Sequence, residues 1–171
     1  WNFPFTIPIR KLSAALAAGN AVIFKPSTNA SISGMLIATT LLDAGLDPGL
    51  VHATVGRSSL IEQELLEAPE LDGVSLTGSY ETAAAIKSRL PVEIPFQAEL
   101  GGKNTLVIWD DADLGKAIEI IKASSFRNNG QICTSAGRIL VHENIYDSLL
   151  ARLSDVVTEM ADASNDDELG I

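Results

Sequence analysis

Short apolar runs alternate with stretches of helical pattern along the first half of the chain, and no other feature of the sequence constrains the fold as strongly. The runs have the length of strands, and the stretches between them have the length of helices. The expected strands are residues 21–24, 51–55 and 73–76, and the expected helices are residues 31–44, 58–67 and 81–89. Right-handed strand–helix–strand units build a parallel sheet covered by helices. The pattern therefore predicts an α/β fold with an open, Rossmann-like parallel sheet.

The alternation breaks around residues 91–95 and then resumes. Residues 96–100 are expected to be extended, and the two glycines that follow allow backbone conformations closed to other residues. The later elements are predicted as strands 106–108 and 139–142, a helix over 114–126, a polar loop over 127–137 and a helix to about residue 159. The predicted helix N-caps are Ser58 or Ser59, Asp111 or Asp113, and Asn144, and Gly45 is the predicted C-terminal stop of the helix 31–44. We place a domain boundary at Leu100, which separates residues 1–100 from residues 101–171.

Charge and cysteine content narrow the possible partners. Twenty-two acidic and 12 basic residues give a net charge of −10, which argues against nucleic acid because phosphate binding needs clustered lysine and arginine. No apolar run approaches the roughly 20 residues of a spanning helix, so no membrane partner is expected. The single cysteine excludes an internal disulfide and indicates a reducing, cytoplasmic setting. Because the chain opens on Trp-Asn-Phe-Pro and ends in Glu-Leu-Gly-Ile, we expect a piece of a longer protein.

Several chemistries are excluded by motifs that the sequence lacks. His52 and His142 are the only histidines, so an HExxH zinc site is impossible and no metal site is expected. Neither the GxxxxGK[ST] phosphate loop nor the GxGxxG dinucleotide fingerprint occurs. The alternating pattern nevertheless looks doubly wound, as in folds that bind dinucleotides.

Two residues in the second half could carry covalent chemistry. Cys133 lies in a polar, glycine-containing stretch that could present its sulfur to a substrate and backbone amides to an oxyanion. A lone cysteine is more often a small buried hydrophobe, and that reading stays open. Glu99 ends an apolar strand before two glycines, where burial would raise its pKa toward the range of a general base. The alternative for Glu99 is a surface charge at a strand end.

Polar residues in the first half could bind a ligand. The side-chain amide of Asn2 could donate a hydrogen bond to an oxyanion, or Asn2 could simply begin a turn. Lys25 follows a buried strand, where open α/β sheets bind ligands, although a solvated lysine is the simpler reading. Thr77-Gly78-Ser79 opens a helix whose backbone amides would favour phosphate, and an ordinary capped turn has the same composition.

Together, five segments resemble motifs of the aldehyde dehydrogenase superfamily, in the same order along the chain. They are Trp1-Asn2-Phe3-Pro4, Leu16-Ala17-Ala18-Gly19-Asn20 with Phe24-Lys25-Pro26-Ser27, Leu76-Thr77-Gly78-Ser79, Glu99-Leu100-Gly101-Gly102-Lys103, and Gly130-Gln131-Ile132-Cys133-Thr134. The spacing of 34 positions between Glu99 and Cys133 also resembles that of the family. The resemblance implies an NAD(P)-dependent, non-acylating aldehyde dehydrogenase. Residues 1–100 would then belong to a cofactor-binding domain and residues 101–171 to the start of an α/β catalytic domain, both incomplete.

The resemblance also implies roles for single residues. Cys133 would attack the aldehyde to form a thiohemiacetal, and the Asn2 side chain and the Cys133 backbone N–H would hold the oxyanion. Hydride transfer to NAD⁺ or NADP⁺ would leave a thioester, and Glu99 would activate the water that hydrolyses it. Lys25 would bind the adenosine ribose and Ser79 the pyrophosphate. The implied cofactor-binding residues are Trp1, Lys25, Pro26, Ser27, Thr28, Gly56, Thr77, Gly78, Ser79, Glu99, Leu100 and Gly101.

Departures from the family pattern bear on the cofactor and on activity. Thr28 stands where many NAD-preferring members have a glutamate, so the 2′-phosphate of NADP would meet no like charge. Of a GxGxxxG turn only Gly56 remains, and Glu62 would lie where the pyrophosphate approaches, with Arg57 as a compensating charge. Family members are much longer, so we expect this piece alone to be inactive. Its parent would form a homo-oligomer, a dimer or a tetramer.

Two other functions stay open. A CoA-acylating relative would resolve the thioester with CoA, although Glu99 favours water. An inactive binding or structural relative would have no need of Cys133, Glu99 and Asn2, and all three are present. For the substrate, Arg127 close to the cysteine indicates an aldehyde that carries a carboxylate, because arginine pairs well with carboxylates.

Overall fold

The computed structural model describes residues 1–162, apart from the side chains of residues 58–60, 62 and 162. Two compact units divide this part of the chain. The first unit comprises Trp1–Thr77 and Glu81–Ala98, and the second comprises Gly78–Tyr80 and the chain from Glu99 onward. The assignment of residues 1–100 to cofactor binding and of residues 101–171 to catalysis stays a prediction.

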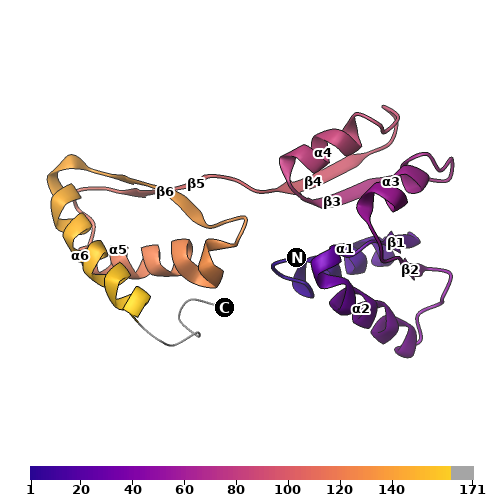
Figure 1. The fold of residues 1–171 in the computed structure, drawn as a ribbon, viewed down its shortest axis with the longest axis horizontal. Helices are drawn as coiled ribbons and strands as arrows, with labels where there is room; N and C mark the ends of the chain where they lie inside the picture. Colours follow the sequence, from indigo (N-terminus) through magenta and orange to yellow (C-terminus); the bar gives the residue numbers. More distant parts are fainter. Residues whose placement is uncertain (163–171) are drawn as a thin grey trace. The chain divides into compact units, whose positions relative to one another are not determined.

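The chain up to Leu100 alternates helices with short strands (Figure 1). The helices are α1 (Thr6–Ala17), α2 (Ser31–Asp43), α3 (Ser58–Leu66) and α4 (Tyr80–Lys87), and a 3₁₀ turn, η1 (Thr28–Ala30), precedes α2. The strands are β1 (Val22–Phe24), β2 (Val51–Ala53), β3 (Val74–Gly78) and β4 (Phe96–Leu100). β1 and β2 pair in parallel, with Val22 opposite Val51, and β3 and β4 form a second pair.

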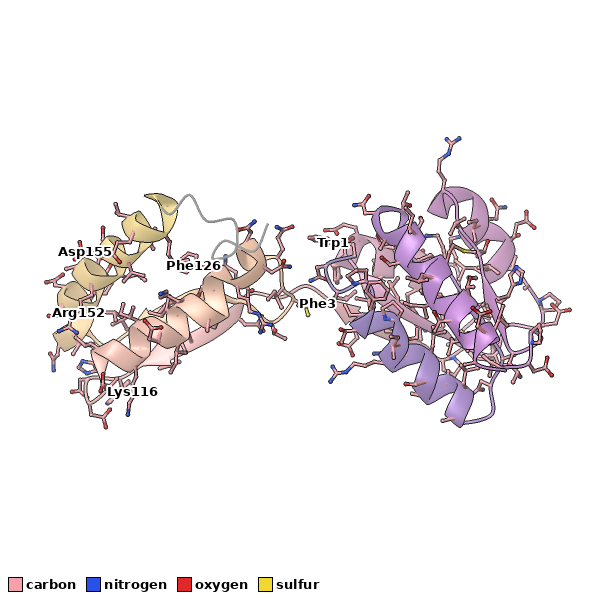
Figure 2. The ribbon with its side chains drawn as sticks, turned by 90° about the horizontal axis from the view of Figure 1, so that it is seen from below. Trp1, Phe3, Lys116, Phe126, Arg152 and Asp155 are labelled. Carbon is pink, nitrogen blue, oxygen red and sulfur yellow. The ribbon has the colours of Figure 1, made fainter. Side chains whose placement is uncertain are left out.

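The chain after Leu100 forms one strand pair and its helices. Its elements are β5 (Asn104–Ile108), α5 (Leu114–Ile121), a π-helical turn (Lys122–Phe126), a 3₁₀ turn (Arg127–Gly130), β6 (Ala136–Val141) and α6 (Glu143–Asp162). β5 and β6 are parallel, and a bulge leaves Gly137 between the partners of Asn104 and Thr105. The core joins Ile108 of β5, Ala117, Ile118 and Ile121 of α5, and Leu149 of α6. Figure 2 shows how the helical segment runs from Lys116 to Phe126.

The predicted α/β class with parallel strands is confirmed, but the expected open sheet is not seen as one piece. The strands of the described residues form three separate two-stranded pairs, because no hydrogen bonds join one pair to the next. Within residues 1–162, no helix combines the length and the apolar character that a membrane crossing requires.

The predicted helix ends are partly right. Asp113 caps α5 as expected, since its Oδ1 accepts the Lys116 N–H at 3.1 Å. Gly45 ends α2 with φ +93°, and its N–H donates to Leu42 O at 2.9 Å. The prediction of Ser58 or Ser59 as a cap is wrong, because α3 begins at Ser58 and the residue before it is Arg57, which forms no side-chain cap.

Other differences have clear physical causes. Asn144 does not cap α6, because the helix begins one residue earlier and the Asn144 N–H donates to His142 Nδ1 at 3.2 Å. The helix predicted over 114–126 widens into a π turn at Lys122, and β6 begins three residues earlier than predicted. α1 is not among the predicted helices. Its Pro8 lies in the first turn, where a missing N–H costs no hydrogen bond.

Candidate active site

Cys133 lies in a tight turn between the helical segment after α5 and strand β6. The Ser135 N–H donates to Ile132 O at 3.0 Å, so Cys133 and Thr134 are the two central residues of a four-residue turn, Ile132–Ser135, here named the cysteine turn. The thiol of Cys133 is free and exposed. A small buried hydrophobe is therefore the wrong reading of Cys133 in this chain. An accessible sulfur is what a nucleophile requires.

The backbone before the cysteine turn is strained. Asn128, Asn129 and Gly130 follow one another in the left-handed region, with φ values of 52°, 54° and 70°. A Cβ on Gly130 would lie 3.0 Å from Ser125 O, so this position requires glycine on both counts. Asparagine tolerates the left-handed region better than most residues. The Asn-Asn-Gly run is the sequence signal for a left-handed backbone at residues 128–130, although only a polar loop was predicted there.

Asn104 ties the cysteine turn to strand β5. Its Nδ2 donates to Cys133 O at 2.8 Å and to Ser135 O at 3.1 Å, contacts that span 29 and 31 positions of sequence. The parallel pairing of β5 with β6 makes this possible, because it sets Asn104 opposite Ala136. Asn104 is not among the predicted site residues. Its only sequence signal is its place directly after the Glu99–Lys103 motif.

The segment that follows Glu99 also runs beside the cysteine turn. A Cβ on Gly102 would lie 3.9 Å from Cys133 O, and one on Gly137 would lie 2.9 Å from Lys103 Cδ. The aliphatic part of Lys103 therefore covers the bulge in β6. Two motifs far apart in sequence thus meet within the second unit. Glu99 itself is the next-to-last residue of β4 and has an exposed side chain, so the described residues do not supply the burial expected of it.

Residues 25–28 form a braced turn at the carboxyl end of β1. Lys25 is half-buried and its Nζ donates to Pro26 O at 3.4 Å. Pro26 is buried against α2, since a Cβ on Gly34 would lie 2.4 Å from Pro26 Cβ and 2.6 Å from Pro26 Cγ. The Ser31 hydroxyl donates to Thr28 O at 3.0 Å and to Ser27 O at 3.4 Å. Lys25 is therefore held in place by the packing of its neighbours, and the side chain of Thr28 is exposed.

The two predicted pyrophosphate segments follow β2 and β3. Gly56 has φ +155° and a Cβ there would lie 2.8 Å from Ile61 Cδ1, so the chain passes close to α3 at this point. Thr77 and Gly78 end β3, Ser79 leads from it into α4, and all three residues are exposed. The side chain of Glu62, expected near the pyrophosphate, lies outside the described residues.

The opening segment leads directly into α1. Trp1 is 59% exposed and Asn2 is half-buried. Phe3 O accepts the Ile7 N–H at 3.2 Å, which ties Trp1–Phe3 to the first turn of the helix (Figure 2). The first unit therefore carries Trp1, Asn2, residues 25–28, Gly56 and Thr77, and the second carries Gly78, Ser79, Glu99–Gly101 and Cys133.

Metal ligands do not gather in the described part of the chain. Across residues 1–162, no three side chains of histidine, cysteine, aspartate or glutamate lie together in a way that could hold an ion. His142 has structural contacts instead. Its ring meets Trp109 edge to face at 4.9 Å, and its Nε2 lies 3.9 Å from Asp110 Oδ2.

Comparison with known families decides what the five motifs mean. The sequence profile of the aldehyde dehydrogenase family matches residues 1–169. The chain belongs to the aldehyde dehydrogenase family. The resemblance inferred from the motifs is confirmed.

Similar members of the aldehyde dehydrogenase family cover varied substrates. The chain is 37% identical over 161 residues to the α-ketoglutaric semialdehyde dehydrogenase of Bacillus subtilis, covering 91% of this chain and 33% of that protein. It is 36% identical over 169 residues to aldehyde dehydrogenase [NAD(P)+] 2 of Saccharomyces cerevisiae, covering 96% and 33%. The crystal structure of an NADP-dependent glyceraldehyde-3-phosphate dehydrogenase from Bacillus halodurans, complexed with NADP, matches with a TM-score of 0.87 at 35% identity, covering 92% and 33%. The chain thus spans about a third of the length of these relatives.

Proposed function

We propose that the full-length protein containing this chain oxidises an aldehyde to a carboxylic acid with NAD⁺ or NADP⁺, through a thioester on Cys133. One observation carries the proposal. The exposed, free thiol of Cys133 lies in a turn braced by the segment that follows Glu99, so the two motifs of the family that hold thiol and carboxylate meet in space. Membership of the aldehyde dehydrogenase family supports the reaction class.

The proposed steps use three side chains. Cys133 Sγ attacks the carbonyl carbon and forms a C–S bond, while the carbonyl oxygen takes the electron pair. The Cys133 N–H and the Asn2 amide stabilise that oxygen by hydrogen bonds. When bound, NAD(P)⁺ would supply the acceptor for the hydride of the former aldehyde C–H bond; the electron pair on oxygen would re-form the C=O bond, so that a thioester remains on Cys133 Sγ. Glu99 then takes a proton from water as the water attacks the thioester, and the C–S bond breaks to release the carboxylic acid and the thiolate.

The residues predicted to hold the cofactor suit a nucleotide. Lys25 offers a half-buried ammonium at the carboxyl end of a parallel strand, the usual place for ligands in α/β folds. The exposed side chain of Thr28 adds no negative charge beside it, which favours the 2′-phosphate of NADP as well as the ribose of NAD. Two of the similar family members described above are named with NAD(P)⁺ and with NADP, respectively. We therefore propose use of both cofactors.

For the substrate, we propose an aldehyde that carries a carboxylate. Arg127 is exposed and begins the 3₁₀ turn that leads into the cysteine turn. Its guanidinium would pair with a carboxylate in a two-pronged contact. A similar family member from Bacillus subtilis is named for α-ketoglutaric semialdehyde, which has this chemistry. We also propose that the protein is cytoplasmic, because an exposed catalytic thiol needs a reducing compartment. Membership of the aldehyde dehydrogenase family supports the further proposal that it forms a homo-oligomer.

The test measures reduced cofactor at about 340 nm with the full-length protein, both cofactors, and a panel of aldehydes with and without a carboxylate. Cys133→Ala should abolish turnover. Glu99→Gln should keep a first burst of reduced cofactor and lose most of the steady rate, because the thioester forms but is not hydrolysed. Arg127→Ala should raise KM only for the carboxylated aldehydes.

The outcomes separate the alternatives. A folded protein that reduces neither cofactor with any aldehyde contradicts the proposed oxidation. Turnover that requires CoA, and that survives in Glu99→Gln, would assign the protein to the acylating class instead. Activity that persists in Cys133→Ala would refute the covalent mechanism.

A further inference from the structure

We propose that Asn104 is the positioning residue of Cys133, because it holds the central peptide of the cysteine turn in one orientation. The catalytic consequence rests on the proposed function. The geometric part rests only on contacts within the second unit. Both hydrogens of the Asn104 amide are used, one on Cys133 O at 2.8 Å and one on Ser135 O at 3.1 Å.

The orientation of the Asn104 amide follows from its partners. Both partners are carbonyl oxygens, which only accept hydrogen bonds, so the NH₂ group and not the oxygen must face them. No other neutral side chain of this size offers two donors from one nitrogen. Aspartate has the same shape but only acceptors, and serine has a single donor. At position 104, the number of hydrogen-bond donors should therefore matter more than the volume of the side chain.

The two acceptors belong to peptides that define the cysteine turn. The Ser135 N–H bond to Ile132 O fixes the plane of the Ile132–Cys133 peptide. Because a peptide is planar and trans, the Cys133 N–H in that plane points away from Ile132 O. This N–H is the backbone donor expected for the oxyanion. The next peptide, Cys133–Thr134, is the central one of the turn.

A central turn peptide needs an anchor to keep one orientation. The two common forms of a four-residue turn differ mainly by a rotation of this peptide. Such a rotation changes ψ of Cys133 and φ of Thr134, and it carries Cys133 O and the Thr134 N–H to the opposite face of the turn. Asn104 opposes the rotation because its bond to Cys133 O would break. The peptide dipoles beside the sulfur are thus held in one direction by a side chain that bonds to backbone carbonyls.

Asn104 is itself firmly placed. It begins β5, and β5 pairs with β6 from Asn104–Ala136 to Ile108–Val141. Ile108 at the far end of β5 lies in the buried core with Ile121, which is fully buried. The side chain of Lys103, the residue before Asn104, lies along Gly137. The two hydrogen bonds of Asn104 therefore connect the cysteine turn to the strand that carries Ile108 into the core.

The first experiment compares Asn104→Ala, Asn104→Ser and Asn104→Asp in the full-length protein. Loss of both donors in Asn104→Ala should lower kcat by roughly ten- to hundredfold, because the backbone dipoles around the reacting sulfur lose their fixed direction, and should change KM by less than about threefold. Asn104→Ser should recover part of kcat through its single donor. Asn104→Asp, with an unchanged shape, should be no better than Asn104→Ala, because its carboxylate repels both carbonyls.

The second experiment reads the thiol without any turnover. Alkylation of Cys133 by iodoacetamide is followed between pH 6 and 10, and trypsin then releases the peptide of residues 128–138, in which Cys133 is the only cysteine. The dependence of rate on pH should shift in Asn104→Ala and Asn104→Asp and return toward wild type in Asn104→Ser. The matched control is Asn20→Ala. Asn20 Nδ2 also donates to a backbone carbonyl, Ala15 O at 3.0 Å, and lies in the other unit.

The two readouts separate this proposal from the proposed function. A wild-type protein that oxidises no aldehyde refutes the function, while the alkylation profiles still decide the role of Asn104. The positioning role is refuted if the three variants have the same alkylation profiles as wild type. Where turnover is present, their kcat values would also have to lie within about twofold of wild type. If Asn104→Ala melts far below wild type, the Ser and Asp variants carry the comparison, since they differ in donors and not in gross packing.

Discussion

Gly34→Ala is expected to weaken the contact between α2 and the turn that holds Lys25. The new Cβ would lie 2.4 Å and 2.6 Å from two ring carbons of Pro26 and 3.3 Å from Phe24 Cε1. Carbon atoms in contact prefer about 3.5–4.0 Å, so the helix and the turn must separate by about 1 Å. The proline ring is rigid and cannot turn aside. Overpacking of this kind costs about 1–3 kcal/mol, against about 1 kcal/mol gained from the better helix propensity of alanine.

With the cost near its upper limit, the net loss for Gly34→Ala is about 2 kcal/mol, which corresponds to a fall in melting temperature of about 8–16 °C for a unit of this size. Since Pro26 follows Lys25, the displaced turn should also raise the KM for NADP⁺ severalfold and leave kcat nearly unchanged. Differential scanning fluorimetry and initial rates measure the two effects.

The control for Gly34→Ala is Thr39→Ala, an exposed position of the same helix, where alanine should be neutral or slightly stabilising. A Gly34→Ala protein that melts at or above the wild-type temperature would refute the reasoning, because α2 would then move away from Pro26 without any loss of stability.

Three further substitutions test the second unit. Gly130→Ala should destabilise it by about 1–2 kcal/mol and slow Cys133 alkylation, since the residue has φ +70° and its Cβ would press on Ser125 O; an unchanged melting temperature would contradict this. Asp113→Ala should cost about 1 kcal/mol through loss of the α5 cap, measured by thermal melting against Asp113→Asn, which keeps an accepting oxygen. Ile121→Ala should cost about 2–5 kcal/mol because the side chain is fully buried, and Ile121→Val should cost about 1 kcal/mol; equal losses for both would argue against a packed core.

The fold was predictable wherever local chemistry decides structure. Gly45 marks the end of α2 because only a residue without Cβ takes a left-handed stop at little cost, and Asp113 caps α5 through its own side chain. α1 was not predicted, and Pro8 does not break it, because Pro8 lies in the first turn of the helix. The cap of α6 was misplaced because the helix begins at Glu143, and the N–H of Asn144 itself donates to His142 Nδ1, a side chain that seldom acts as a cap.

The candidate site residues were chosen from motifs and not from periodicity, and their roles stay a prediction. Cys133 and Glu99 stand out as a cysteine in a polar loop and a glutamate before two glycines, and order along the chain connects them to the family. Whether each is buried does not follow from the motif. Cys133 is exposed, against the most common reading of a lone cysteine, and Glu99 is exposed where burial was expected. Burial depends on what other parts of the protein cover, and sequence spacing carries no such information.

Asn104 shows why the remaining part of the site needed a structure. Three successive left-handed residues before Gln131 store strain, and strained backbone persists only where its surroundings over-determine it. The Asn-Asn-Gly run indicates the left-handed backbone locally, but the hydrogen bonds that hold the cysteine turn after it span 29 and 31 positions. Those contacts exist because the bulge at Gly137 sets the register of β5 against β6. A one-residue change in that register would move the Asn104 side chain to the other face of the pair, so the anchor of Cys133 is a property of strand pairing.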